Sequence, residues 1–256
     1  MSSRIWTPAA LWSERRSQAS DCWRLVEAQH LTSTLKLTDT LAEQQVLEEL
    51  LEETKPPLAP KTRELHYLMA APFRYGAVYP KGSRFRRAGK TLGVFYGAER
   101  PRTAAAEMAF YRLLFFAESP GTPWPQNPGE FTAFNAPART TEALDLMSAP
   151  LNASRAEWTG LADYEPCQAL AESAREAGIA LIRYESVRDQ ERGANLALLS
   201  AIPFVGTSPK RTETWRIKLG TFGAQVIREF PRQRFEFPRS AFEADPRIEG
   251  MAWVRE

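Results

Sequence analysis

The sequence predicts a single domain of mixed helices and strands. Its 256 residues lie near the upper limit of what one hydrophobic core commonly supports. Apolar, β-branched or alternating runs predict strands at 22–28, 94–96, 179–184 and 195–202. Breaker-free segments with apolar residues three and four apart predict helices at 40–53, 103–116 and 163–177. Two further alternating runs, 214–219 and 225–230, predict a hairpin near the end of the chain.

The N-terminal part combines an extension, a strand and an inserted helical segment. Residues 1–21 form the expected extension, and the strand after it includes Arg24. In the inserted segment 38–60, Thr40 and Glu43 match a capping box at the start of a helix. An apolar stripe follows, made by Leu41, Leu47, Leu50 and Leu51. This helix is expected either to pack on the core of its own chain or to bind a partner or a second copy.

A strand-to-helix unit in the segment 82–116 brings charged and aromatic residues together. Its strand at 94–96 lies between two glycines, and Pro101 suits the first position of the helix that follows. Within that helix, Glu107 shares a face with three largely apolar residues, Ala104, Tyr111 and Leu114. The carboxylate is therefore expected to point inward, where it needs hydrogen-bond donors, a changed pKa or a chemical role.

Three arginines precede this strand: Arg84, Arg86 and Arg87. A guanidinium group can bind two phosphate oxygens at once, which lysine cannot do. A structural ion pair with Glu107 explains the same residues equally well. Taken by themselves, these residue types leave a phosphate site and an ion pair both open.

The second half of the chain is expected to place a serine at the end of a strand. The segment 120–150 is rich in proline and predicts mostly loop, with a short strand at 131–135. Further on, the helix at 163–177 leads into a buried strand that delivers Ser186 to its C-terminal end. Residues 205–256 are expected to form the hairpin and a tail that wraps the surface.

Composition and charge are those of an ordinary globular protein. Hydrophobic residues make up 43% and charged residues 25%, which excludes a disordered chain. Lys and Arg number 33 against 31 Asp and Glu, so bulk electrostatic binding to nucleic acid is not expected. Two cysteines, Cys22 and Cys167, lie in apolar segments and indicate a reducing compartment. With neither a signal peptide nor a membrane-spanning stretch expected, the prediction is a cytoplasmic protein.

Several familiar chemistries do not fit the residues. Gly89-Lys90-Thr91 resembles the end of a phosphate-binding P-loop, but the first glycine of that motif would fall at Arg84. Two histidines and two separated cysteines do not match a zinc site. The sequence contains neither a Gly-x-Ser-x-Gly elbow nor a GxGxxG fingerprint. Arginine, tyrosine, glutamate and serine remain, a set that suits cleavage at an anomeric carbon without a metal.

Six motifs occur in a recognisable order between about residues 22 and 204. They are Gly82-Ser83-Arg84-Phe85, Val94-Phe95-Tyr96, Thr103-Ala104-Ala105-Ala106-Glu107, Gln168-Ala169-Leu170-Ala171, Ile182-Arg183-Tyr184-Glu185-Ser186-Val187-Arg188 and Gly193-Ala194-Asn195-Leu196-Ala197. In order and spacing they resemble the signature of the RES domain, whose name records an arginine, a glutamate and a serine. Trp23-Arg24 also resembles the aromatic residue and arginine of an early strand in that family.

The resemblance implies an α+β fold like that of ADP-ribosyltransferases, with a split, mostly antiparallel core sheet and flanking helices. It implies that Arg84 binds a diphosphate and the adjoining ribose together with either Arg24 or Arg74, and it leaves the choice between those two open. Glu107 would be the catalytic carboxylate, and Ser186 would position ribose or nicotinamide.

Three further positions complete the expected site. Tyr96 would stack near nicotinamide, and Asn195 would support the Ser186 loop. Arg86 departs from the family's usual asparagine or tryptophan neighbourhood and would add phosphate affinity. Arg100 replaces the usual small capping residue before Pro101, so no side-chain cap is expected at this helix start.

The resemblance also implies a function. RES domains are toxins of bacterial Xre-RES type toxin-antitoxin systems and consume NAD+, so we expect NAD+ as a substrate, no cofactor, no metal and no membrane. The expected partner is an antitoxin with a helix-turn-helix domain, and a homodimer is left open. One alternative is transfer of ADP-ribose to a protein. Another is a nucleic-acid-binding module using a basic patch of Arg84, Arg86, Arg87 and Lys90.

Overall fold

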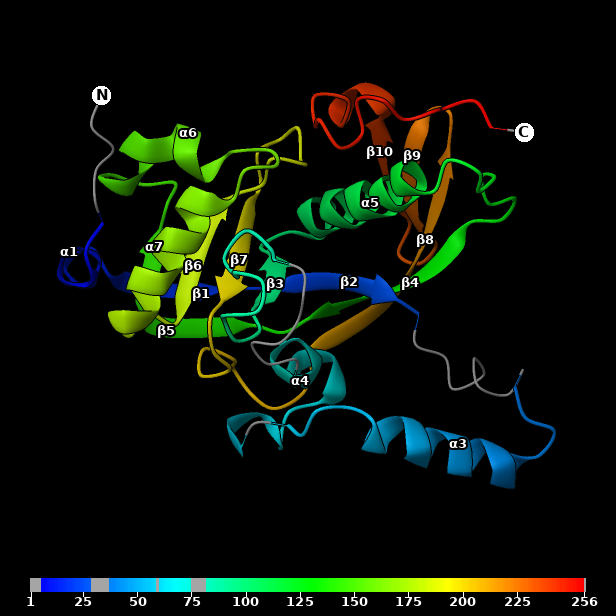
Figure 1. Cartoon of the computed structure of the whole chain (residues 1–256), viewed down its shortest axis with the longest axis horizontal. Helices are drawn as coiled ribbons and strands as arrows, with labels where there is room; N and C mark the ends of the chain where they lie inside the picture. The colour runs from blue at the N-terminus through cyan, green and yellow to red at the C-terminus, as the bar shows by residue number, and fades with distance from the viewer. Residues whose placement is uncertain (1–5, 29–36, 59, 75–81, 256) are drawn as a thin grey trace.

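The computed structural model describes residues 6–28, 37–58, 60–74 and 82–255. Its strands are β1 (Arg16–Ser20), β2 (Trp23–Glu27), β3 (Phe95–Ala98), β4 (Gly129–Asn135), β5 (Ala138–Asp145), β6 (Leu181–Glu185), β7 (Ala194–Leu198), β8 (Arg211–Gly220), β9 (Gly223–Arg228) and β10 (Gln233–Pro238). Within the described residues they form one sheet in the order β1, β5, β6, β7, β3, β2, β4, β8, β9, β10 (Figure 1). Only β5 and β6 are parallel neighbours there.

Helices cover both faces of this sheet. They are α1 (Pro8–Ser13), α3 (Leu41–Glu53), α4 (Tyr67–Arg74), α5 (Pro101–Glu118), α6 (Arg155–Trp158) and α7 (Glu165–Glu176), with short 3-10 turns at Pro60–Thr62, Leu151–Ser154 and Arg239–Ala241. Helices α5 and α7 lie on one face, and α4 packs against β3 from the other (Figure 1). The α+β class with a mostly antiparallel sheet is therefore confirmed.

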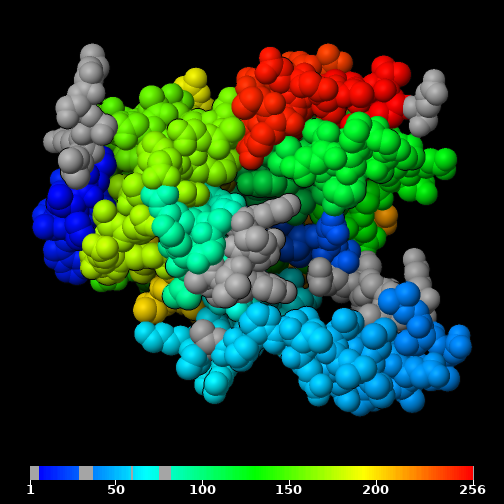
Figure 2. All heavy atoms as spheres, viewed as in Figure 1, coloured from blue at the N-terminus to red at the C-terminus, as the bar shows by residue number. Residues whose placement is uncertain are grey.

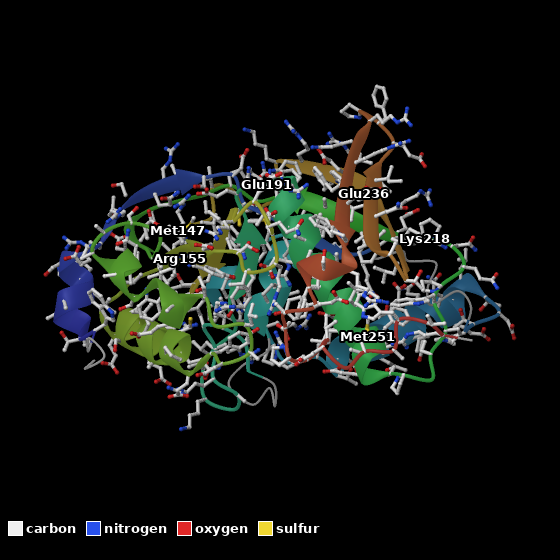
Figure 3. The ribbon with its side chains drawn as sticks, turned by 90° about the horizontal axis from the view of Figure 1, so that it is seen from above. Met147, Arg155, Glu191, Lys218, Glu236 and Met251 are labelled. Carbon is white, nitrogen blue, oxygen red and sulfur yellow. The ribbon has the colours of Figure 1, made fainter. Side chains whose placement is uncertain are left out.

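The sheet consists of two halves that meet at a single residue pair. Strand β3 pairs with β7 along its whole length, and β2 pairs with β4 along its whole length. Between β2 and β3, only Trp23 and Ala98 are paired. Seen from above (Figure 3), Met147 and Arg155 mark one half, and Lys218, Glu236 and Met251 mark the other. The sheet is thus split between β2 and β3, as expected.

Three apolar clusters stabilise these halves. One lies between α5 and the strands β2, β4, β8, β9 and β10. A second packs α7 onto β6 and β7, and a third packs α4 onto the opposite face of β3, β6 and β7. The first two clusters share one side of the sheet, and the split between β2 and β3 lies at their junction. A ligand site at the split can therefore take side chains from both halves.

Helix α3 begins as predicted but does not pack on the core. Thr40 Oγ1 accepts a hydrogen bond from Glu43 N over 3.2 Å, and Glu43 Oε2 accepts one from Thr40 N over 3.1 Å, which is the expected capping box. None of its residues is buried, and Leu41 is 75% exposed. The helix projects from the body at the lower right in Figure 2. The expectation that its apolar stripe packs on its own core was wrong for this helix.

Two other expectations were wrong in part. In the segment 120–150, the strand expected at 131–135 is confirmed as β4, but the rest is not mostly loop, since β5 spans a further eight residues. The prolines lie before β4, in the turn between the two strands at Pro137, and after β5 at Pro150. The terminal tail does more than wrap the surface. Strand β10 extends the sheet, and four residues beyond it are buried in the cluster under α5: Phe242, Ile248, Met251 and Trp253.

No helix among the described residues is long and apolar enough to cross a membrane.

Candidate active site

A cavity of about 220 Å³ opens where the two halves of the sheet meet. Strands β2 and β3, the loop before β3, helix α5 and the ends of β6 and β7 all contribute to its wall. The lining residues are Trp23, Arg24, Leu25, Ser83, Arg84, Tyr96, Gly97, Ala98, Ala104, Glu107, Met108, Tyr111, Tyr164, Tyr184, Val187, Arg188 and Asn195. Among these described residues the wall is mostly apolar and aromatic, with three arginines and one carboxylate. Such a lining is typical of a small-molecule site.

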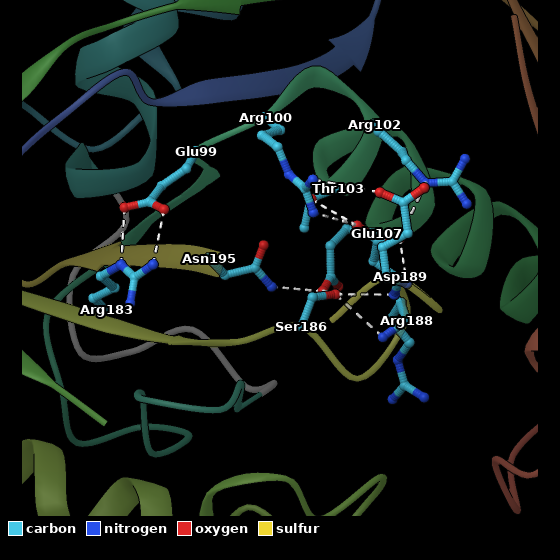
Figure 4. Close-up of polar contacts among 11 residues, drawn as sticks. Glu99, Arg100, Arg102, Thr103, Glu107, Arg183, Ser186, Arg188, Asp189 and Asn195 are labelled. Atoms are coloured by element: carbon cyan, nitrogen blue, oxygen red, sulfur yellow. Dashed lines mark hydrogen bonds and ion pairs between the residues drawn. The ribbon is translucent and has the colours of Figure 1, made fainter. Parts of the chain in front are cut away.

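Glu107 is held by two donors from the opposite wall. Its Oε1 accepts a hydrogen bond from Ser186 Oγ over 2.6 Å and another from Asn195 Nδ2 over 2.6 Å (Figure 4). Its other oxygen, Oε2, has no hydrogen-bond partner among the described residues. The carboxylate points inward from α5, as the helix spacing predicts, and it keeps one oxygen for a ligand.

The hydroxyl of Ser186 has a fixed direction. Ser186 follows β6 directly, and its Oγ accepts hydrogen bonds from the backbone N–H groups of Arg188 and Asp189, each over 3.2 Å. Two N–H groups already point at this oxygen, so its own proton must go to Glu107. Ser186 therefore acts on Glu107 as a donor, and the turn after β6 sets its geometry.

Asp189 ties this turn to the start of α5. Its carboxylate accepts a hydrogen bond from Thr103 Oγ1 over 2.7 Å and one from Arg102 Nε over 3.3 Å (Figure 4). Thr103 precedes Glu107 by one helical turn, so the contact fixes the relative position of Glu107 and Ser186. The N-cap residue Arg100 makes no side-chain capping bond, and Pro101 is the first helical residue, as predicted.

Arg24 is one of two cavity arginines, with Arg84, that have no carboxylate partner among the described residues. Its Nη1 donates to the backbone oxygen of Tyr96 over 2.8 Å, and its Nε is buried without a partner among the described residues. Burial lowers the pKa of Arg24, although an arginine remains charged at neutral pH. An anionic ligand would supply the missing partner.

Asn195 holds an unpartnered acceptor next to Glu107. Its side chain lines the cavity and is 2% exposed, and its Oδ1 has no hydrogen-bond partner in the described part of the chain. Buried polar atoms are rarely left unpaired. Together with Arg24 Nε, this oxygen marks the cavity as a site completed by a ligand with both donors and acceptors.

The segment 58–220, more than half of the chain, matches the family model described as the RES domain. The chain belongs to the RES-domain family. Its fold is similar to that in the crystal structure of the M. tuberculosis MbcT-MbcA toxin-antitoxin complex, with a TM-score of 0.45 and 11% identity over 79% of this chain and 90% of that one. No curated protein sequence matches the chain.

Within the RES match, Arg84 and Tyr96 line the cavity but also hold its rim. Arg84 donates to the backbone oxygens of Trp158 and Gly160 over 2.7 and 2.9 Å. The phenol oxygen of Tyr96 contacts Ser83 Oγ over 2.8 Å and accepts from Phe85 N over 2.9 Å. Burial raises the pKa of Tyr96, so this phenol stays protonated at neutral pH.

Two predicted site residues lie outside the cavity. Arg74 donates to Pro56 O over 2.5 Å and pairs with Glu52 over 2.7 Å, which places it beside α3. Arg86 Nε donates to Thr91 O over 3.2 Å within its own loop. Of the two arginines that the sequence left open, Arg24 lines the cavity and Arg74 does not.

Sequence reasoning missed part of the wall of this RES domain. Tyr164, Tyr184 and Arg188 line the cavity, and Arg188 pairs with Asp245 over 2.6 Å. Tyr184 and Arg188 lie within the RES motif around Ser186, and their positions on either side of the serine were the available signal. Asp245 lies beyond the matched segment, and nothing near it in sequence indicates a site.

Proposed function

We propose that this RES-domain protein cleaves the bond between nicotinamide and ribose in NAD+. The observation that supports this most directly is Glu107, a carboxylate in a largely aromatic cavity, with one oxygen held by Ser186 and Asn195. A fixed carboxylate stabilises an oxocarbenium-like transition state, because no reorganisation is needed when positive charge develops on the sugar.

Each part of NAD+ has a candidate partner. The diphosphate carries negative charge, and Arg24 is a cavity arginine that has no carboxylate partner among the described residues and whose buried Nε has no hydrogen-bond partner there. Nicotinamide has an amide N–H donor and ribose has hydroxyl donors, and Asn195 Oδ1 can accept a hydrogen bond from either of them. Tyr96 and the other tyrosines of the wall offer flat apolar surface to the rings. Arg84 holds the rim through its carbonyl contacts and adds positive charge beside the diphosphate.

The reaction breaks the C–N bond, and its electron pair stays on the nicotinamide nitrogen, so nicotinamide leaves as a neutral molecule. Glu107 faces the developing charge on the sugar. An oxygen of water or phosphate then forms the new bond to the anomeric carbon. With water the products are ADP-ribose and a proton, which passes to solvent. With phosphate the product is ADP-ribose carrying a phosphate at that carbon. A protein side chain as acceptor would make the enzyme an ADP-ribosyltransferase.

We propose further that this activity makes the protein a cytoplasmic toxin. RES domains are toxins that consume NAD+. Loss of cellular NAD+ would therefore arrest growth unless an antitoxin with a helix-turn-helix domain covers the cavity. Expression of the wild-type protein in bacteria should then stop growth and lower NAD+, and co-expression of the antitoxin should restore both.

The decisive experiment follows nicotinamide release from NAD+ by the purified protein. Glu107→Gln keeps the shape of the side chain and removes its charge, and it should reduce the rate by at least about 100-fold. Glu118→Gln is the matched control, because Glu118 is exposed at the end of the same helix. Equal rates for a folded Glu107→Gln variant and the wild type would refute the assignment. Assays with water alone, with phosphate and with added protein identify the acceptor.

A further inference from the structure

The C-terminal segment after β10 reaches the wall of the cavity. Its Asp245 is 1% exposed, and among the described residues its carboxylate accepts hydrogen bonds from the side chain and backbone of Arg247 and forms an ion pair with Arg188. Arg247 donates to Oδ1 from Nε over 3.0 Å and to Oδ2 from Nη2 over 2.9 Å. Arg188 Nη1 lies 2.6 Å from Oδ2. A residue outside the RES match thus contacts one of the cavity's three arginines.

Arg188 connects this carboxylate to the catalytic side of the cavity. Its guanidinium stacks on the ring of Phe110 at 3.7 Å, and its Nη2 donates to Leu161 O over 2.7 Å. Its backbone N–H donates to Ser186 Oγ over 3.2 Å. Arg188 is 3% exposed, so its charge needs the nearby carboxylate.

Arg247 connects the same carboxylate to the tyrosine wall. Its Nη2 donates to the phenol oxygen of Tyr164 over 3.1 Å and to Leu161 O over 2.9 Å. Leu161 O therefore accepts from both arginines, and Asp245 lies between them. Two separate stretches of the wall, at Tyr164 and at Arg188, are held by one buried acid.

The charge balance at this cluster depends on Asp245. Burial by itself would raise the pKa of Asp245, but hydrogen bonds from Arg247 and the charge of Arg188 more than offset this, and the net result is a lowered pKa. The acid is therefore ionised at neutral pH. Without its charge, Arg188 and Arg247 would face each other with no anion between them, and both would move toward solvent.

We propose that Asp245 is a positioning residue of the cavity: by holding Arg188 and Arg247 it fixes the wall at Arg188 and Tyr164 and so sets the affinity for the dinucleotide. The effect on affinity rests on the proposed function. Glu107 keeps its own donors, Ser186 and Asn195, when Asp245 changes, so the chemical step is affected much less than binding.

The test compares Asp245→Asn with Glu243→Gln. Both changes remove one charge from the same segment, and Glu243 pairs only with the neighbouring Arg239 at the surface among the described residues. For nicotinamide release, Asp245→Asn should raise KM for NAD+ about tenfold, with kcat changed less than about threefold. Glu243→Gln should leave both values unchanged.

A second readout does not need activity. Amide hydrogen exchange in Asp245→Asn should speed up at 161–164 and 186–189, far from the substitution in sequence, and stay at the wild-type rate in β6 and β7. If wild type releases no nicotinamide but these two segments loosen, the proposed function fails and the positioning role stands. Unchanged exchange at 161–164 and 186–189 overturns the proposal. A fall of kcat by about tenfold with KM unchanged also overturns it.

Discussion

Ser186 Oγ lies 2.6 Å from Glu107 Oε1, although 79 positions separate the two residues. The two side chains come from different secondary-structure elements. Glu107 comes from the helix after β3, and Ser186 comes from the turn after β6. Asp189 joins the two elements through Thr103, so the contact follows from a network of buried bonds. The positions of Ser186 and Glu107 are therefore set together by one hydrogen-bonded network.

Replacing Ser186 by alanine should weaken both the fold and the activity. The change removes a donor from Glu107 and leaves the N–H groups of Arg188 and Asp189 without their acceptor. A buried unpaired donor costs about 1–3 kcal/mol, so Tm should fall by about 4–10 °C and nicotinamide release by about 10-fold to 100-fold. Scanning calorimetry and the release assay measure these effects.

Ser200→Ala provides the control for that change. The hydroxyl of Ser200 is buried without a hydrogen-bond partner among the described residues, so its removal should leave Tm unchanged or slightly higher. If Ser186→Ala were as stable as Ser200→Ala, the turn after β6 would not depend on the serine.

Local pattern was enough to predict the central elements of the site. The glycines around 94–96, the proline at 101 and the helical spacing predicted that Glu107 points inward, and the strand before Ser186 placed that residue at a strand end. The remaining wall depends on tertiary contacts. Asp245 meets Arg188 across 57 positions of sequence (245 minus 188), and an isolated acid in a charged tail has no local signal.

The choice between Arg24 and Arg74 shows the same limit. Both follow or adjoin aromatic residues, so residue type does not separate them. Pairing of β2 with β3 and β4 brings Arg24 to the split of the sheet, whereas α4 carries Arg74 to the opposite face. Proline content misled the interpretation of 120–150, because prolines beside a strand break no ladder hydrogen bond.

Arg24→Met should strongly weaken NAD+ binding without unfolding the protein. The guanidinium is buried and has no carboxylate partner among the described residues, so its loss removes a desolvated charge from the free protein. Affinity for NAD+ should fall by about 100-fold or more in isothermal titration calorimetry, while Tm changes by no more than a few degrees.

Arg74→Met is the comparison that separates the two arginines. Arg74 pairs with Glu52 next to α3, away from the cavity, so its replacement should leave NAD+ affinity within about twofold of wild type. Loss of affinity in Arg74→Met together with normal affinity in Arg24→Met would reverse the assignment.

Cys22 should make stability fall at alkaline pH. Burial raises the pKa of this thiol from 9.0 to about 12, partly opposed by the charge of Arg24. The folded-state pKa lies above the unfolded one, so the contribution is fully present below about pH 9 and is lost as pH rises toward 12. Between pH 9 and 10 the loss should reach about 1 kcal/mol.

Urea unfolding at several pH values tests this expectation. The free energy of unfolding should decline less steeply with pH for Cys22→Ala than for wild type, and some decline should persist because other alkaline groups remain. Parallel slopes for the two proteins would rule out Cys22 as a source of the decline.

Gly193→Ala should disrupt the site through a steric contact. A Cβ atom at this position would lie 2.0 Å from Thr103 Oγ1 and 2.8 Å from Asp189 Oδ2, so the bond that joins the serine turn to α5 could not survive unchanged. Gly193 O also accepts from Ser186 N over 2.8 Å, and the strain therefore reaches the donor of Glu107 directly. We expect a loss of about 2–4 kcal/mol in the free energy of unfolding and a lower rate of nicotinamide release.

Gly121→Ala is the matched control, because a Cβ there meets no atom within 4 Å, and it should change stability by less than about 0.5 kcal/mol. Equal stability of the two variants would mean that the turn moves freely relative to α5, and Asp189 would then have no part in placing Ser186.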